Sequence, residues 1–245
     1  MVRIDRKKMK QGLFLAHFRS HLSYPFGPLR EFFESVQDLF MNEKTKILDR
    51  IERETADLSQ EEKYHYEWHW EDYGKLEDSF PNVLRNSLFI AIYTEFEDKL
   101  KFICNALAHE KGCPIAVHEW RGGILEKSKS CLKKDIGISW SLRTNLWDEI
   151  LRIRRARNVL VHNGGWLDVA KSAKGGETED LKLIKYIRNE RKSINLLERN
   201  GFYRIQLTDS FIPEVADLFE ELLNELFESI AHLVKTSGFY IRESG

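Results

Sequence analysis

One segment of this 245-residue chain combines an arginine, an asparagine and a histidine at spacings that suit chemistry on a phosphate. Arg157 and Asn158 are adjacent, and His162 follows four residues after Asn158. A guanidinium binds phosphate oxygens through paired hydrogen bonds, whereas an imidazole exchanges protons near neutral pH. An amide side chain can hydrogen-bond the phosphate or orient the imidazole. The segment therefore indicates an anion site with acid–base chemistry.

These residues are expected on a helix from Ser139 to His162, which Asn163-Gly164-Gly165 terminates because glycine adopts the left-handed capping conformation without strain. At about 100° per residue, Arg157 falls in the middle of the apolar face, whereas Asn158 and His162 lie at its edge. Arg157 and His162 point about 140° apart, so they act together only if Arg157 reaches round the helix or the last turn unwinds. The face expected to be buried comprises Leu146, Ile150, Ile153, Leu160 and Val161.

An arginine on an apolar face must meet a carboxylate, a phosphate or a cavity, because burying an unpaired charge is costly. The structural alternative is that Arg157 forms an internal salt bridge with Glu95 or Glu97, and that His162 only caps the helix. The functional alternative is that Arg157 holds a phosphate while His162 moves a proton. The residues by themselves keep both alternatives open.

Apolar residues recur with the period of a helix, 3.6 residues, along most of the chain. The stretch from 166 to 180 lacks this period and is expected to form a loop. Asp209 should cap the last helix. Helices are expected from about Pro28 to Leu58, from Ser79 to about His109, around Ile124 to Leu132 with a break near Gly137, and from about Phe211 to Val234.

Residues 193–207 differ, because apolar residues alternate with polar ones on both sides of Asn200-Gly201, the strongest short signal for a hairpin. The predicted fold is therefore all-α, mainly a helical bundle, with a small β-hairpin insertion near 193–207. We expect an N-terminal helical extension over residues 1–75, packed on a helical domain over residues 76–238.

The net charge of −1 is an average over segments of opposite sign. Residues 119–163 carry ten basic and five acidic side chains, and residues 171–204 carry nine and five. Residues 21–80 carry seven basic and fifteen acidic side chains. This pattern predicts a basic groove suited to nucleic acid, between acidic flanks. The alternative is that each charged run is a solvated helix face.

Several classes of function lack support in the sequence. No apolar stretch approaches the roughly 20 residues that span a bilayer, and no secretory signal follows the basic N-terminus. Three cysteines argue against a disulfide scaffold. Phosphate-binding glycine loops and a nucleophile elbow are absent, and His109, Cys113 and His118 lack the paired spacing of a zinc site. We expect a cytoplasmic protein with no membrane partner, no metal and no cofactor.

Arg157-Asn158 followed by three residues and His162, at the end of a helix with a Gly-Gly exit, resembles the signature of the HEPN superfamily. The helix order agrees, with a glutamate-bearing helix before the motif and an amphipathic helix after it. The resemblance covers residues from about 80 to 235, and the first 75 residues lie outside it.

The resemblance implies a helical bundle that forms a homodimer through the motif helix, so that the Arg and His of both chains line one cleft. Active members are metal-independent endoribonucleases, several of them toxins or defence effectors. In this chain Arg157, His162 and Asn158 would be catalytic, and Arg154 and Glu97 would bind the substrate.

The partners that the resemblance implies are RNA, a second copy of the chain and, in a toxin–antitoxin or antiviral defence system, an antitoxin or second subunit. The favoured hypothesis is an endoribonuclease that uses the ribose 2′-hydroxyl as the nucleophile. The alternative is a non-catalytic HEPN-like module that binds a partner protein or a nucleotide through the same cleft.

Overall fold

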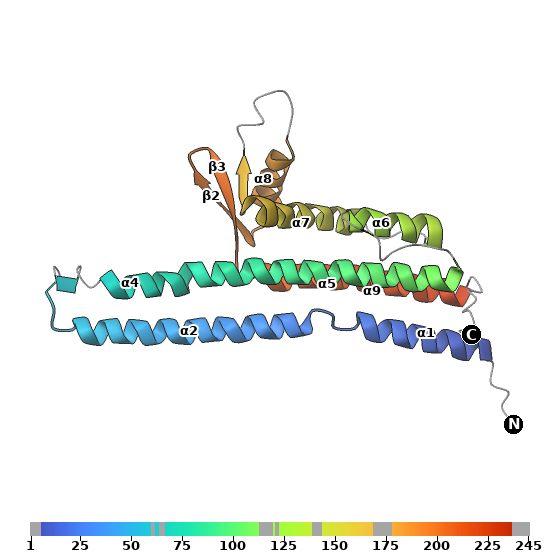
Figure 1. The fold of residues 1–245 in the computed structure, drawn as a ribbon, viewed down its shortest axis with the longest axis horizontal. Helices are drawn as coiled ribbons and strands as arrows, with labels where there is room; N and C mark the ends of the chain where they lie inside the picture. Colours follow the sequence, from blue (N-terminus) through green and yellow to red (C-terminus); the bar gives the residue numbers. More distant parts are fainter. Residues whose placement is uncertain are drawn as a thin grey trace. The chain divides into compact units, whose positions relative to one another are not determined.

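The computed structural model describes residues 6–59, 62–63, 67–112, 120, 123–138, 144–168 and 178–236. Helices dominate these residues, and a small antiparallel sheet interrupts them, so the fold is all-α with a small β insertion (Figure 1). None of the described helices combines the length and the apolar composition that crossing a bilayer requires.

The elements follow one another as the periodicity predicts for most of the chain. Three long helices begin and end within three residues of the expected positions, and the positive φ of Gly137 ends the helical segment that precedes it. In chain order the elements are α1 (Arg6–Leu22), α2 (Gly27–Thr55), α4 (Glu67–Gly74), the π-helix η1 (Lys75–Ser79), α5 (Phe80–Lys111), α6 (Ile124–Ser130), the π-helix η3 (Cys131–Ile136), α7 (Thr144–Asn163), β1 (Trp166–Asp168), α8 (Glu179–Glu190), β2 (Ile194–Arg199), β3 (Phe202–Leu207) and α9 (Phe211–Thr236).

The chain divides into two compact units, and α5, α7 and α9 each contribute residues to both. The expected boundary between an extension over residues 1–75 and a domain over residues 76–238 stays a prediction. The first unit comprises Met1–Phe26, Ile92–Arg157 and Glu214–Gly245, and the second unit comprises Gly27–Ala91 and Asn158–Pro213.

Aromatic side chains from distant parts of the sequence form the core of the first unit. Phe219 of α9 stacks on Phe96 of α5, with 4.1 Å between the ring centroids, and Tyr93 meets the same ring edge-on at 5.8 Å. Helix α1 joins this core through Phe18, whose ring lies 5.5 Å from that of Phe102. Such contacts between rings add to the free energy gained by burying them, and they hold α1, α5 and α9 together.

In the second unit, α2 packs on the start of α5, where the rings of Phe40 and Phe80 lie 6.3 Å apart. The sheet has the strand order β1-β3-β2, and both pairings are antiparallel. Asn200 and Gly201 connect β2 to β3 with φ angles of 52° and 79°, which only Gly and Asn adopt at low cost. The predicted hairpin is confirmed.

The expectation of a loop over residues 166–180 is wrong at both ends. Trp166–Asp168 forms β1, which pairs with β3, and α8 begins at Glu179 after Thr178, whose hydroxyl accepts a hydrogen bond from Leu181 N at 3.3 Å. A strand of three residues carries no detectable alternation, so only its pairing with β3 specifies it.

Candidate functional site

Two glycines end the helix that carries the predicted motif. Gly164 and Gly165 have φ angles of 58° and 86°, as expected for residues that terminate α7. A side chain at Gly165 would also be crowded, since its Cβ would lie 3.4 Å from the carbonyl oxygen of Ile205. The chain therefore leaves α7 immediately after Asn163 and enters β1. The first residues of the helix expected from Ser139 lie outside the described residues.

The buried face of α7 differs from the helical-wheel prediction. Val161, expected to be buried, is 40% exposed, and Leu160 is half-buried. Arg157 is consequently half-buried rather than central to an apolar face. The buried face is set by the positions at which neighbouring helices supply apolar side chains. The sequence of α7 alone does not contain this information. The residues of α7 that the structure buries are Leu146, Trp147, Ile150, Ile153, Ala156 and Val159.

Within the first unit, Arg157 and Glu97 meet at a buried tyrosine. The guanidinium carbon of Arg157 lies 5.5 Å from the centroid of the Tyr93 ring, a distance suited to a cation–π contact. Burial raises the pKa of Tyr93, and the charge of Glu97 raises it further, so the phenol keeps its proton. Tyr93 therefore presents an uncharged face to the arginine.

Glu97 has an unusual electrostatic position. Burial raises the pKa of its carboxyl group, and the nearby positive charge of Arg157 lowers it without cancelling that effect. A carboxylate in a close ion pair has a lowered pKa, so Glu97 is a desolvated acid in the field of Arg157 rather than a tightly held counter-ion. The other carboxylate expected to pair with Arg157, Glu95, forms its ion pair with Lys99 at 2.9 Å.

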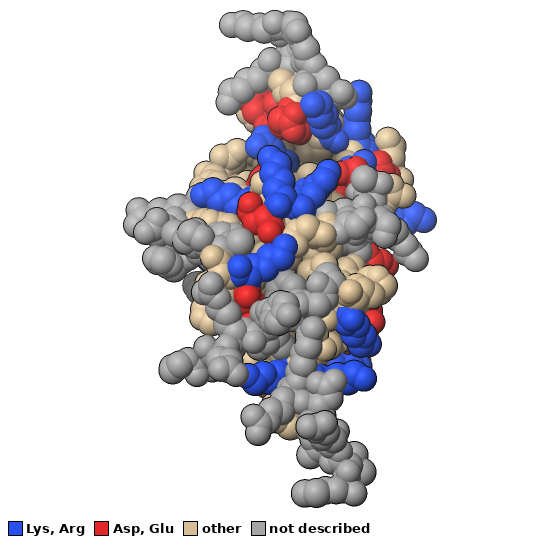
Figure 2. Space-filling view, turned by 90° about the vertical axis from the view of Figure 1, so that its right-hand side faces the viewer, with Lys and Arg blue, Asp and Glu red and all other residues tan. Residues whose placement is uncertain are grey.

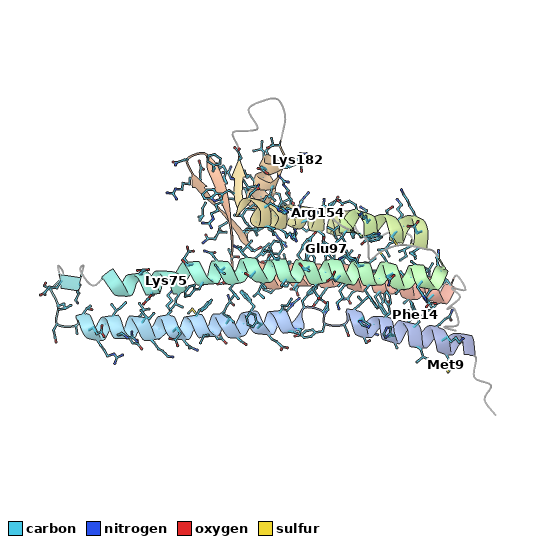
Figure 3. The ribbon with its side chains drawn as sticks, in the orientation of Figure 1. Met9, Phe14, Lys75, Glu97, Arg154 and Lys182 are labelled. Carbon is cyan, nitrogen blue, oxygen red and sulfur yellow. The ribbon has the colours of Figure 1, made fainter. Side chains whose placement is uncertain are left out.

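Arg154 lies one turn before Arg157 and has a different partner. Its guanidinium forms an ion pair with Glu126 of α6, and Figure 3 shows Arg154 on α7 and Glu97 on the neighbouring helix α5. Partial burial acts to raise the pKa of Glu126, but the hydrogen bond from Arg154, a backbone hydrogen bond and the charge of Arg154 together outweigh it and leave the pKa below its ordinary value. Arg154 thus forms an ion pair that lowers the pKa of Glu126.

The division between the units falls between Arg157 and Asn158, so the other two motif residues belong to the second unit. Asn158 is half-buried, and His162 is exposed in the last turn of α7. An exposed imidazole at the end of a helix is accessible to a substrate and can exchange protons with it. The structure thus brings Arg154, Arg157 and Glu97 together around Tyr93, and it places Asn158 and His162 one turn apart on α7.

A buried arginine that the sequence reasoning missed lies in the second unit. Arg85 of α5 is 8% exposed, and it donates hydrogen bonds from Nη1 to Asp209 at 2.6 Å and from Nη2 to Asn82 at 2.9 Å. The same signal that singled out Arg157 could have found it, because Arg85 shares a helix face with Phe89 and Ile92. Asp209, expected to cap α9, accepts the hydrogen bond from Arg85 with its carboxylate.

Other potential sites are limited in the described part of the chain. No group of three or more His, Cys, Asp or Glu side chains there is arranged to hold a metal ion, and Cys113 and His118 lie outside it. A cavity of about 210 Å³ in the second unit is bordered by Arg85, Asp209 and Lys44, and none of the predicted site residues lines it.

The charge distribution is mixed on the face that Figure 2 shows. Among the described residues, Lys and Arg side chains are interspersed there with Asp and Glu rather than forming an unbroken basic surface. The basic groove expected from the segment charges therefore stays a prediction.

No protein-family model matches this chain, and no curated protein or solved structure is significantly similar to it.

Proposed function

We propose that this protein is a metal-independent endoribonuclease of HEPN type that cuts RNA at a composite site in a homodimer, in the setting of a toxin or a phage-defence effector. The observation that carries the proposal is the exposed His162 in the last turn of α7, with Asn158 one turn before it and Arg157 on the same helix. The Gly164-Gly165 exit supports it further, because it ends the helix directly after the motif and leaves the imidazole accessible.

The reaction needs one base, one acid and a stabilised phosphate. The ribose 2′-hydroxyl attacks the adjacent phosphorus, the bond from phosphorus to the 5′-oxygen breaks, and a 2′,3′-cyclic phosphate and a 5′-hydroxyl remain. His162 of one protomer takes the proton of the 2′-hydroxyl, and the same residue of the second protomer protonates the departing 5′-oxygen. Arg157 stabilises the charge that develops on the phosphate oxygens.

The supporting residues have separate tasks in this proposal. Asn158 orients the imidazole or hydrogen-bonds the phosphate. Arg154 and Glu97 bind the substrate around the reacting phosphate, and the raised pKa of Glu97 makes its protonated form more available as a hydrogen-bond donor than that of an ordinary glutamate. The uncharged phenol ring of Tyr93 lies beside the guanidinium of Arg157.

The test compares His162→Ala with His232→Ala, which changes an exposed histidine on α9. His162→Ala should lower the rate of RNA cleavage by about 10²- to 10⁴-fold, the usual contribution of a general acid or base, while His232→Ala should not change it. Cleavage should persist in EDTA and leave 2′,3′-cyclic phosphate ends. Equal cleavage by the His162→Ala variant and the wild type would refute the proposal.

The contacts of Arg154 with Glu126 and of Arg157 with Tyr93 favour one other function, a non-catalytic module in which these arginines stabilise the fold. That module would bind a partner protein or a nucleotide and show no ribonuclease activity at any protein concentration. Its Arg157→Ala variant would lose stability, whereas the endoribonuclease would lose activity.

A further inference from the structure

The three-stranded sheet of the second unit exposes aromatic and basic side chains on one face. In the pairing register, Trp166 lies beside Arg204 and Arg204 lies beside Leu197, while Phe202 lies between Asp168 and Arg199. Side chains two residues apart on a strand point to the same side, so these two rows share one face. We call the surface formed by Trp166, Leu197, Arg199, Phe202 and Arg204 the open sheet face.

The opposite face of the sheet supplies the core. Leu167, Ile194 and Ile205 point to that side and are at most 3% exposed. Helix α8 covers it, and the guanidinium carbon of Arg188 lies 4.8 Å from the ring centroid of Tyr203 there. The open sheet face lies opposite this core, and an antiparallel sheet of this kind normally carries polar side chains on its solvent side.

The apolar side chains on the open sheet face are unusually exposed to solvent. Trp166 is 36% exposed, Leu197 48% and Phe202 43%. The guanidinium carbon of Arg204 lies 5.7 Å from the ring centroid of Trp166, and Arg199 is directly across from Phe202 in the hairpin. Each of the two rows thus contains one aromatic ring next to one guanidinium.

Alternating rings and guanidinium groups on an open sheet match the chemistry of single-stranded RNA. Bases stack on aromatic rings and on the planes of arginines, while the guanidinium charge attracts the phosphates. The two rows are about 6.7 Å apart, roughly twice the rise of 3.4 Å per nucleotide along a stacked strand. Two neighbouring bases of an RNA strand can therefore contact the two rows if a protein side chain lies between the bases.

The open sheet face is also connected to the proposed catalytic residue within the second unit. β1 begins four residues after His162, and a Cβ at Gly164 would lie 3.9 Å from Cδ1 of Trp166. Trp166 thus packs against the turn that ends α7. An RNA strand bound on Trp166 would reach the end of the helix that carries His162.

A protein partner fits this surface less well. A standard protein interface contains about 20–30 residues on each side, and its centre is depleted in charge. The open sheet face consists of strands of three and six residues, and its apolar side chains alternate with arginines. The single acidic side chain in its two rows, Asp168, is half-buried, and its backbone N–H donates to Asp180 Oδ2 at 3.2 Å.

We infer that the open sheet face binds single-stranded RNA without sequence preference, by stacking bases on Trp166 and Phe202, and delivers the strand to the end of α7. The second half of this inference rests on the proposed function, whereas the binding itself does not.

The experiment measures binding of a fluorescein-labelled 12-nucleotide oligouridine by fluorescence anisotropy, in the His162→Ala background so that the RNA stays intact. Trp166→Leu and Phe202→Leu keep the apolar area but remove the ring, and each should weaken binding by about 5- to 150-fold. Trp166→Phe and Phe202→Tyr keep a ring and should bind within about threefold of the parent. Leu48→Ser changes a leucine of similar exposure on α2, outside the open sheet face, and should leave the affinity within about twofold.

Three outcomes would overturn the inference. The leucine variants could bind oligouridine as tightly as the parent, Leu48→Ser could weaken binding as much as they do, or a 12-base-pair RNA duplex could bind as well as the single strand. A leucine variant that changes the oligomeric mass in light scattering, while its RNA affinity stays unchanged, would instead assign the face to a protein contact and overturn the inference too.

Failure of this inference is distinguishable from failure of the proposed function. If the leucine variants lose affinity but the wild type cleaves no RNA, the sheet binds RNA and the endoribonuclease proposal fails. If the wild type cleaves RNA and the leucine variants bind normally, only the role of the sheet is refuted. Thermal unfolding of each variant checks that the fold is unchanged.

Discussion

Arg85 and Arg157 each lie on a helix beside apolar residues, yet their surroundings differ. Arg85 is almost fully buried, and both terminal nitrogens donate hydrogen bonds, to Asp209 and to Asn82. Arg157 is half-buried, lies over the Tyr93 ring, and is near a carboxyl group whose pKa burial raises. Arg85 is thus held by a carboxylate and an amide, whereas the guanidinium of Arg157 lies against the uncharged ring of Tyr93.

The acidic partners explain the difference in physical terms. A close ion pair stabilises the ionised carboxylate and lowers its pKa, as Arg154 does for Glu126. Glu97 shows the opposite shift, so the field of Arg157 does not offset the cost of removing Glu97 from water.

The largest expected difference is between the methionine variants of Arg157 and Arg85. Methionine keeps much of the side-chain length but removes the charge. Arg157→Met should lower the rate of RNA cleavage by about 10²- to 10³-fold, because a lost transition-state contact costs about 3–4 kcal/mol. Arg85→Met should leave the rate per folded molecule unchanged. Single-turnover cleavage of a labelled RNA measures both. Equal loss of rate in the two variants would remove the functional distinction between these arginines.

Substitutions at Arg85 and Asp209 should change the free energy of unfolding rather than the rate of cleavage. Asp209→Ala leaves the buried guanidinium of Arg85 without its carboxylate and should lower the free energy of unfolding by about 3 kcal/mol. Arg85→Met should cost less than about 1.5 kcal/mol, because the remaining Asp209 is exposed and water can hydrate it. Urea unfolding followed by circular dichroism compares the two. A greater loss for Arg85→Met would contradict the assignment of Arg85 as a buried, carboxylate-dependent charge.

A smaller effect is expected from the ion pair between Arg154 and Glu126. The side chain of Glu126 is 53% exposed, so Glu126→Gln should lower the free energy of unfolding by about 0.2–1 kcal/mol. Glu43→Gln, which alters a more exposed pair with Lys46, should change it less. The same urea titrations measure both variants. A loss above 2 kcal/mol for Glu126→Gln would show that Arg154 has a structural role like that of Arg85.

The smallest expected effect is on how the free energy of unfolding depends on pH through Glu97 and Glu126. The folded state raises the pKa of Glu97 above 4.5, so its favourable contribution is present below about pH 4.5 and is lost as the pH rises through the folded-state value. Glu97→Gln, which resembles the protonated acid, should therefore gain stability relative to the wild type as the pH rises from 4.5.

Glu126 should show the reverse, because its folded-state pKa lies below 4.5 and its contribution is lost as the pH falls through that value. The advantage of the wild type over Glu126→Gln should shrink on acidification. Chemical unfolding of both variants between pH 3 and 8 gives the two slopes. Slopes of the same sign would mean that Glu97 is paired in the way Glu126 is.

Much of the fold is local and could be predicted from the sequence. The helices α2, α5 and α9 follow from apolar periodicity, and the hairpin follows from Asn200-Gly201, since only a few residues adopt the positive φ angles of that turn. The end of α7 could be predicted for the same reason, because Gly164 and Gly165 adopt positive φ angles. The motif residues could be located on this helix for the same reason, although their roles stay predictions.

What the sequence determined by itself is therefore the set of helices, the hairpin and the placement of Arg157, Asn158 and His162 at the end of one helix. Only the tertiary structure decided which face of α7 is buried, because that depends on where other helices offer apolar side chains. It also decided that Arg85 meets Asp209, 124 residues away, and that Trp166 joins a sheet through pairing with Arg204. These contacts are non-local, and no pattern within a single segment specifies them.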